Sequence, residues 1–193
     1  MSNKQKGTPV MRQFWETKKN HPNSILLFRM GDFYETFEED AKLTSKILGI
    51  TLTKRSNGAA SEVPLAGFPY HALEQYLHKL LKSGHRVAIC EQVEDPKESK
   101  GIVKREVTEV ISPGTALSDN YLKEEENNYL ASIFFENKFV AISILDFSTG
   151  DFFGRVAKIE QLSNIINQYN IKELIITESQ YNFYKDIVDR LEI

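Results

Sequence analysis

The sequence predicts a mixed α/β chain in two parts: a domain built on a mixed sheet, followed by the opening elements of a second α/β domain. Its 193 residues are 41% hydrophobic and 26% charged, which is typical of a folded chain. Helical periodicity alternates with short β-branched apolar runs along most of the chain. This pattern lapses in "GTALSDNYLKEEENN", where acidic residues cluster. We therefore expect one domain over residues 1–118 and part of another over 119–193.

The first elements follow from local signals. Thr8 can cap a helix for which Pro9 suits the first position. The apolar run "SILLF" (24–28) predicts a buried strand. Apolar residues at helical spacing over 37–48 predict a second helix, and Gly49 is a suitable stop.

The next stretch alternates between weak and strong signals. "ITLT" (50–53) predicts a short strand, and "KRSNGAASE" (54–62) predicts a polar loop. "VPLAGFPYH" (63–71) holds two prolines and a glycine, which favours an edge strand or an irregular extended segment. Amphipathic spacing over 72–81 predicts a helix that Gly84 closes.

Strands dominate the remainder. "RVAIC" (86–90) predicts a central strand, and the β-branched content of 101–111 favours a strand over a helix there. Three hairpin-linked strands, a helix and a strand then give the opening order of a ribonuclease H-like domain. The segments are "YLASIFF" (129–135), "FVAISILDF" (139–147), "FFGRV" (152–156), a helix over 159–169, "ELIIT" (173–177) and a last helix over 183–191.

The charge is distributed unevenly along the chain. The net charge is −3, but residues 1–118 carry 17 lysines and arginines against 14 acids, and residues 119–193 carry 7 against 13. The first part suits a polyanion better than the second. The single Cys90 predicts a small buried thiol in a reducing compartment. No secretory signal or membrane-length apolar run is present in the sequence, so we expect a soluble, cytoplasmic protein and no membrane partner.

Common catalytic motifs are missing from the sequence. There is no P-loop and no G-x-G-x-x-G, so no ordinary nucleotide cradle is predicted. His71, His78 and His85 are seven residues apart, about 10.5 Å of helical rise, which is too far for two imidazoles to share a metal. Cys90 lacks a C-x-x-C partner. We expect no cofactor and no metal in this chain.

A metal-dependent nuclease is an alternative for the second part. Asp146 and Asp151 are its candidate ligands, but two-metal hydrolysis needs several acids converging from different elements. The helix over 159–169 offers Glu160 alone. Aspartates at a strand end and in a turn are the favoured interpretation.

The stretch "RMGDFYETF" places Phe33 and Glu35 two residues apart beside a glycine. A structural interpretation puts the ring in the core and the acid in the first turn of a helix. However, Gly31 permits a bend that pushes the following residues outward, and other aromatics can fill the core. Lys54 and Arg55 would join the same sheet end if "ILLF" and "ITLT" were neighbouring strands.

An exposed ring beside a carboxylate suits a nucleic-acid wedge. Apolar side chains inserted into the minor groove unstack base steps at a cost of a few kcal/mol, and this cost falls where pairing is already broken. The acid offers a hydrogen-bond partner to a base edge and repels phosphates where no such base is available. A Phe33 ring enclosed in the core, with Glu35 in an internal ion pair, would contradict this hypothesis.

Six segments of the sequence carry a resemblance to a known family: "GDFYETF", "LTKR", "PLAGFPYHALEQYL", "VAICEQVEDP", "KGIVKREVTEVISPGT" and "LDFSTGDF". Together they resemble the N-terminal part of the MutS family of bacterial mismatch-repair proteins. The similarity extends over nearly all of residues 8–177.

The resemblance assigns roles to individual residues. It implies that Phe33 stacks on a mismatched base from the minor groove and that Glu35 hydrogen-bonds that base, in protonated form when the base offers an acceptor. Lys54 and Arg55 match a loop near the DNA backbone. Five further residues are placed as support for the wedge: Met30, Leu65, Pro69, Tyr70 and His71.

The resemblance also implies the context of these residues. Residues 1–118 would form the mismatch-binding domain, and 119–193 the start of a non-catalytic connector that meets MutL. ATP, Mg²⁺ and homodimerisation belong to parts of the full-length family that this chain lacks, so no enzymatic activity is expected of it. A protein-interaction fragment whose acidic part docks a repair partner stays open as an alternative, with the nuclease less favoured.

Overall fold

The computed structural model describes residues 7–58, 60–94, 101–116, 127–191 and 193, with backbone alone for Ala60 and Ser61. The chain divides into two compact units, Met1–Ile111 and Ser112–Ile193. The sequence-predicted boundary at 118–119 lies outside the described residues. No helix among the described residues is long and apolar enough to cross a membrane.

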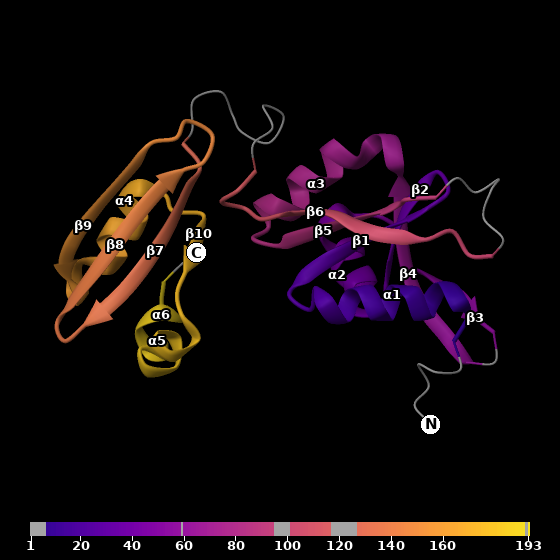
Figure 1. Ribbon diagram of the computed structural model, residues 1–193, viewed down its shortest axis with the longest axis horizontal. Coiled ribbons are helices and arrows are strands. Elements are labelled where there is room, and N and C mark those ends of the chain that lie inside the picture. Colours follow the sequence, from indigo (N-terminus) through magenta and orange to yellow (C-terminus); the bar gives the residue numbers. More distant parts are fainter. Residues whose placement is uncertain (1–6, 59, 95–100, 117–126, 192) are drawn as a thin grey trace. The chain divides into compact units, whose positions relative to one another are not determined.

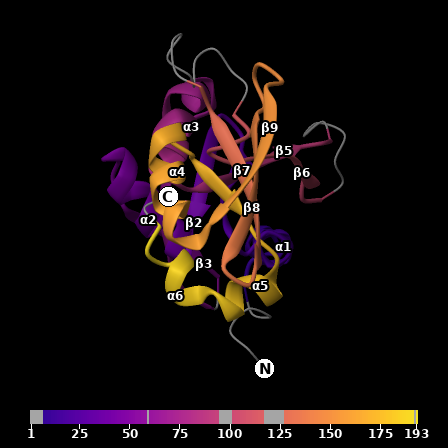
Figure 2. The ribbon, with the colours of Figure 1, turned by 90° about the vertical axis from the view of Figure 1, so that its left-hand side faces the viewer.

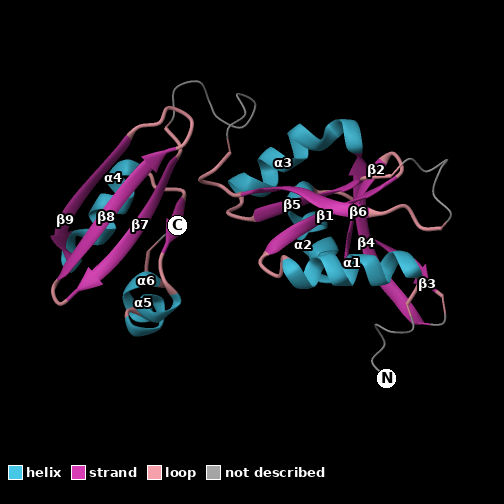
Figure 3. Cartoon of the chain, viewed as in Figure 1, coloured by secondary structure: helices cyan, strands magenta, loops and turns pink. Residues whose placement is uncertain are grey.

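The first unit is a six-stranded mixed sheet. Figures 1 and 3 show helices on both faces of this sheet. The strand order is β3-β4-β2-β1-β5-β6, in which β1 and β5 are parallel and the other pairs antiparallel. This confirms the predicted mixed α/β class. The elements are α1 (Pro9–Asn20), β1 (Ser24–Met30), β2 (Phe33–Phe37), α2 (Glu38–Leu48), β3 (Thr53–Asn57), β4 (Ala60–Pro69), the 3₁₀ turn η2 (Tyr70–Ala72), α3 (Leu73–Lys82), β5 (Arg86–Gln92) and β6 (Arg105–Ile111).

Helix α1 packs on one face of this sheet. The Thr8 hydroxyl accepts from Met11 N at the start of α1, as its sequence predicts. A buried apolar cluster lies between α1 and the sheet. It includes Cys90, and burial raises the pKa of this thiol to about 12. The cluster comprises Met11, Phe14, Leu26, Phe28, Phe37, Val63, Ala88 and Cys90.

Helix α3 lies on the opposite face of the sheet from α1 (Figure 1). Its Leu77 and Leu80 are fully buried, and Tyr76 packs its ring against Phe68 of β4 with centroids 4.6 Å apart. Helix α2 ends at Gly49, whose positive φ of 68° provides the left-handed cap that the sequence predicts.

Three predictions for residues 50–71 are wrong. The segment 50–52 is not a strand, and residues 54–62, predicted as a loop, lie largely in the antiparallel hairpin β3–β4. Strand β4 is an interior strand between β3 and β2, so the predicted edge position is also wrong. Because β3 pairs with β4, "ILLF" and residues 50–53 are not neighbouring strands. The sequence of β3 is polar and does not look like a strand, and the structure identifies it as one through its pairing with β4.

The second unit is a four-stranded sheet of order β10-β7-β8-β9, with β10 parallel to β7 and the other pairs antiparallel. Figure 2 shows α4 beside β7, β8 and β9. A single helix was predicted over 183–191, but the structure has two short helices from residue 178 to 188. The elements are β7 (Tyr129–Glu136), β8 (Phe139–Asp146), β9 (Phe152–Lys158), the 3₁₀ turn η3 (Ile159–Gln161), α4 (Leu162–Tyr169), β10 (Glu173–Ile175), α5 (Glu178–Phe183) and α6 (Lys185–Val188).

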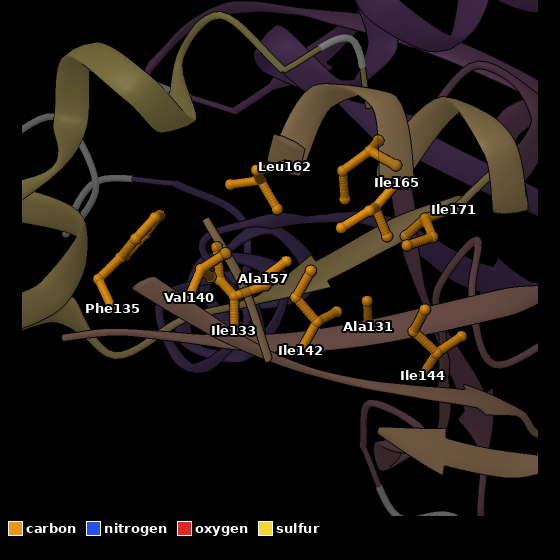
Figure 4. Close-up of a cluster of buried hydrophobic side chains, with 11 residues drawn as sticks. Ala131, Ile133, Phe135, Val140, Ile142, Ile144, Ala157, Leu162, Ile165 and Ile171 are labelled. Atoms are coloured by element: carbon orange, nitrogen blue, oxygen red, sulfur yellow. The ribbon is translucent and has the colours of Figure 1, made fainter. Parts of the chain in front are cut away.

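The core of the second unit lies between its sheet and α4. Leu162, Ile165 and Ile166 of α4 meet alternate residues of the strands, such as Ile133 and Ile142, in the cluster drawn in Figure 4. The alternation of buried and exposed residues along β7 and β8 matches a sheet with one face covered.

Candidate nucleic-acid interface

The stretch that holds Phe33 is a tight hairpin between β1 and β2. Met30 pairs with Phe33 across a two-residue loop of Gly31 and Asp32. Gly31 has a φ of +58°, a conformation that glycine adopts without strain. On the far side of β2, Phe33 pairs with Pro69 of β4. Residues 33–37 are therefore strand, and Glu35 is not in the first turn of a helix.

Phe33, Glu35 and Phe37 alternate onto the sheet face that α1 covers. At the far end of β2, Phe37 is 0% exposed and packs edge-on against Phe14 of α1, with ring centroids 4.9 Å apart. At the hairpin end, Phe33 is 47% exposed. The ring of Phe33 is therefore outside the apolar core, as the wedge hypothesis requires.

Glu35 lies between these two rings and is ion-paired. Its Oε2 accepts a hydrogen bond from Nη1 of Arg55 at 2.7 Å, and its side chain is 19% exposed. Burial raises the pKa of Glu35 above its usual range, and the opposing attraction of Arg55 does not fully offset this. The carboxylate is thus held on the same sheet face as Phe33. Its protonated form is more favoured there than it would be in water.

The strand order explains how Arg55 reaches Glu35. Strand β4 separates β3 from β2, and the residue opposite Glu35 on β4 is Gly67. A Cβ at Gly67 would lie 2.9 Å from the Tyr34 carbonyl oxygen and 3.4 Å from Cγ of Glu35. A side chain at position 67 would therefore crowd the backbone of β2 directly beside Glu35.

The two predicted backbone contacts differ from each other. Lys54 is exposed on the edge strand β3, where its ammonium lies 3.5 Å from Glu62, another exposed side chain. Arg55 is engaged with Glu35. Lys54 is therefore accessible to a phosphate, whereas the guanidinium of Arg55 is occupied by its ion pair with Glu35.

Four of the five predicted support residues lie near the β1–β2 hairpin loop, whereas Leu65 pairs with Phe37 at the far end of β2. Met30 and Leu65 are half-buried and pack against the cluster beneath α1. Pro69 is the cross-strand neighbour of Phe33, and it leads into η2. Tyr70 and His71 are exposed in η2, with ring centroids 5.9 Å apart.

The sequence did not single out Arg29, Glu91 or Gly67. Arg29 alternates with Met30 along β1, so its side chain points to the sheet face opposite Phe33, where it meets Glu91 of the parallel strand β5. Gly67 lies in the "LAGFP" segment between two prolines. An arginine at a strand end and a glycine within an extended run were the signals available in the sequence.

The nuclease interpretation of Asp146 finds no support. Its carboxylate is fully buried and accepts hydrogen bonds from the backbone N–H groups of Asn128, Ser148 and Thr149 and from the Ser148 hydroxyl. Burial opposes ionisation of Asp146, but these donors outweigh it and lower the pKa. The carboxylate therefore organises a turn. No group of three or more histidine, cysteine or acidic side chains suited to a metal occurs among the described residues.

Comparison with known proteins identifies relatives over most of the chain. The family model described as MutS domain I matches residues 8–120. A DNA mismatch repair protein MutS of Porphyromonas gingivalis is 49% identical over 180 residues, which is 93% of this chain and 20% of that protein. The Flavobacterium johnsoniae protein of the same name is 50% identical over 94% of this chain, and that of Methanothrix thermoacetophila 48% over 87%. The chain spans about a fifth of the length of these relatives.

Proposed function

The chain belongs to the MutS family, and we propose that its first unit recognises mismatched or unpaired bases in duplex DNA by inserting the Phe33 ring from the minor groove. The observation that carries this proposal is the exposure of Phe33 (47%) at the end of the β1–β2 hairpin, because the other aromatic side chains of these two strands are buried: Phe28, Tyr34 and Phe37. Solvent-exposed rings on a rigid strand are available to stack on a base.

The energetics favour weakly paired sites. Inserting a ring between base steps costs a few kcal/mol of unstacking, and less where hydrogen bonds and stacking are already lost. Phe33 has a rigid base for this task because it is paired on both sides, with Met30 and with Pro69. The ring therefore selects for poor pairing and not for a particular base.

Glu35 supplies the polar contact in this proposal. Among the described residues, the hydrogen bond to its carboxylate involves Oε2, so Oε1 is the atom that we assign to a base edge. The raised pKa favours a protonated carboxyl, which can donate to a base acceptor. Because Arg55 neutralises the ionised form, repulsion of DNA phosphates by Glu35 is weaker than the sequence alone suggested.

We propose that the second unit is the start of the connector. Its three antiparallel strands, followed by a helix and a strand parallel to the first, are in the order expected for the opening of a ribonuclease H-like domain, which supports this proposal. In a longer protein of the family, we propose that this connector meets MutL. We likewise assign ATP hydrolysis and homodimer formation to regions beyond this chain.

The test is a competition gel shift with a G·T duplex and its fully paired counterpart. The wild-type chain should bind the G·T duplex preferentially, and Phe33→Ala should abolish the preference while retaining binding to paired DNA. Phe139→Ala, which removes another half-exposed ring from the second unit, is the matched control and should change nothing. Equal preference in wild type and Phe33→Ala would refute the role of the ring.

A further inference from the structure

We infer that Arg29 is a positioning residue for the Phe33 wedge: with Tyr70 it braces the β1–β2 hairpin loop from the sheet face opposite the ring. This inference rests on the proposed function.

The guanidinium of Arg29 has several partners at once. Its Cζ lies 3.9 Å from the centroid of the Tyr70 ring, and its Nε donates to the Gly31 carbonyl oxygen at 2.5 Å. Its Nη1 lies 3.6 Å from Oε2 of Glu91. A planar guanidinium can stack on a ring and donate in its own plane at the same time, which an ammonium cannot.

Tyr70 holds the other residue of the same loop. Its backbone N–H donates to the Asp32 carbonyl oxygen at 2.9 Å. Arg29 therefore binds Gly31, Tyr70 binds Asp32, and the stack between the two side chains joins these contacts. Both residues of the loop that precedes Phe33 are thus fixed by one stacked pair.

Tyr34 supports the Arg29–Tyr70 pair from the buried side of the same sheet face. This residue is the cross-strand partner of Arg29 and is 2% exposed, and its hydroxyl donates to Glu91. Burial first, and then the hydrogen bond to Glu91, raises the pKa of Tyr34, so the hydroxyl stays a donor. Glu91 accordingly accepts from Tyr34 and attracts Arg29, which fixes the orientation of the guanidinium.

Arg29 is poorly placed to bind DNA directly. Its side chain is 18% exposed, and its guanidinium faces Tyr70, Gly31 and Glu91. A phosphate contact would require it to leave these partners. Its effect on DNA binding should therefore pass through the position of Phe33, and should appear in mismatch preference and not in general affinity.

The experiment compares Arg29→Lys with Tyr70→Leu, Tyr70→Phe and the double variant Arg29→Lys/Tyr70→Leu. Lysine keeps the charge near Glu91 but loses the planar stack, while Tyr70→Phe keeps the ring. Arg86→Lys, an exposed arginine at the start of β5, is the matched control. The readouts are the ratio of affinities for G·T and paired duplexes, the fluorescence of a 2-aminopurine beside the mismatch at saturating protein, and the melting temperature.

We expect Arg29→Lys and Tyr70→Leu each to lower the G·T preference about fivefold, and the double variant to lower it no further, because both remove one stacked contact. The 2-aminopurine signal should fall with the preference, whereas affinity for paired DNA should hold. Tyr70→Phe, which keeps the stacked ring, should restore the preference that Tyr70→Leu loses, and Arg86→Lys should match wild type.

A preference within threefold of wild type in Arg29→Lys would overturn the inference, and so would multiplicative losses in the double variant. Equal losses on both duplexes with a lowered melting temperature would show a general structural role and overturn it as well. If wild type itself lacks a preference for G·T, the proposed function fails and the inference falls with it.

Discussion

Phe33 and Phe37 are the same residue type on the same face of the same strand, but their surroundings are opposite. Phe37 is covered by α1 and is 0% exposed, while Phe33 at the hairpin end is 47% exposed. Strand alternation assigns both rings to one face, and the position of the covering helix then decides which becomes core. The lesson is that one amphipathic strand can supply both a core side chain and an exposed side chain, and the exposed one is the ring that we propose inserts into DNA.

The largest expected effect is on stability at the covered end. Phe37→Ala should lower the free energy of unfolding by about 3–5 kcal/mol, because it empties a fully packed site beside Phe14. Phe33→Ala should lower it by less than about 0.5 kcal/mol, since water already contacts the ring. Urea unfolding of the two variants measures the contrast, and similar losses would mean that Phe33 belongs to the core.

Gly67→Ala should destabilise the chain by about 1–3 kcal/mol and displace Glu35, because the new Cβ would meet the Tyr34 carbonyl oxygen at 2.9 Å. Gly154→Ala is the matched control, because its nearest neighbour would be the Ile142 carbonyl oxygen at 3.4 Å. Chemical shifts of Glu35 and Arg55 report the displacement. An unaltered ion pair in Gly67→Ala would show that the glycine is not what makes room for the acid.

The next effect concerns the pH dependence of stability that arises from Glu35, which lies between Phe33 and Phe37 on β2. Because the folded pKa of Glu35 is raised, its contribution to stability is full below the unfolded value of about 4.3 and is lost as the pH rises through the folded pKa. Arg55→Gln removes an attraction that lowers this pKa, so the pKa should rise further and the loss should extend to higher pH.

Two measurements check this expectation: a carbon-13 NMR titration of Glu35, and the difference in unfolding free energy between wild type and Glu35→Gln. That difference should decline as the pH rises, and more steeply on the Arg55→Gln background. A difference that grows with pH would show that Arg55 outweighs burial.

The smallest effect is expected at Lys54, whose exposed side chain lies beside Glu62 on the edge of the sheet. Lys54→Ala should leave stability nearly unchanged and weaken binding to G·T and paired duplexes equally. The slope of log affinity against log salt should decrease in magnitude by about 0.9, the value for one phosphate contact. A loss confined to the G·T duplex would instead make Lys54 part of mismatch reading.

Much of the fold was predictable because local signals agreed with it. Thr8 and Pro9 predicted the start of α1, and the apolar spacing before Gly84 predicted α3. The apolar runs of β1 and β5 predicted buried strands, as the structure has them. These elements bury a periodic face, so their patterns are visible in the sequence.

The hairpin β3–β4 and the ion pair were not predictable. Strand β3 reads "TKRSN", a polar edge strand held by pairing with β4 and by the Asn57 side chain, which accepts from the Thr8 backbone N–H at 2.8 Å. Arg55 meets Glu35 across an intervening strand, so the contact depends on sheet order. The exposure of Phe33 was a hypothesis from "GDFYETF", and its role in DNA binding stays a prediction.

The most direct test asks whether mismatch preference follows the cost of opening the duplex. Affinities of wild type and Phe33→Ala should be measured for duplexes that differ at one base pair, from fully paired through several mismatches to a single unpaired base. The account predicts that wild-type affinity rises as the local pairing weakens and that this dependence vanishes in Phe33→Ala. The same dependence in both proteins would contradict it.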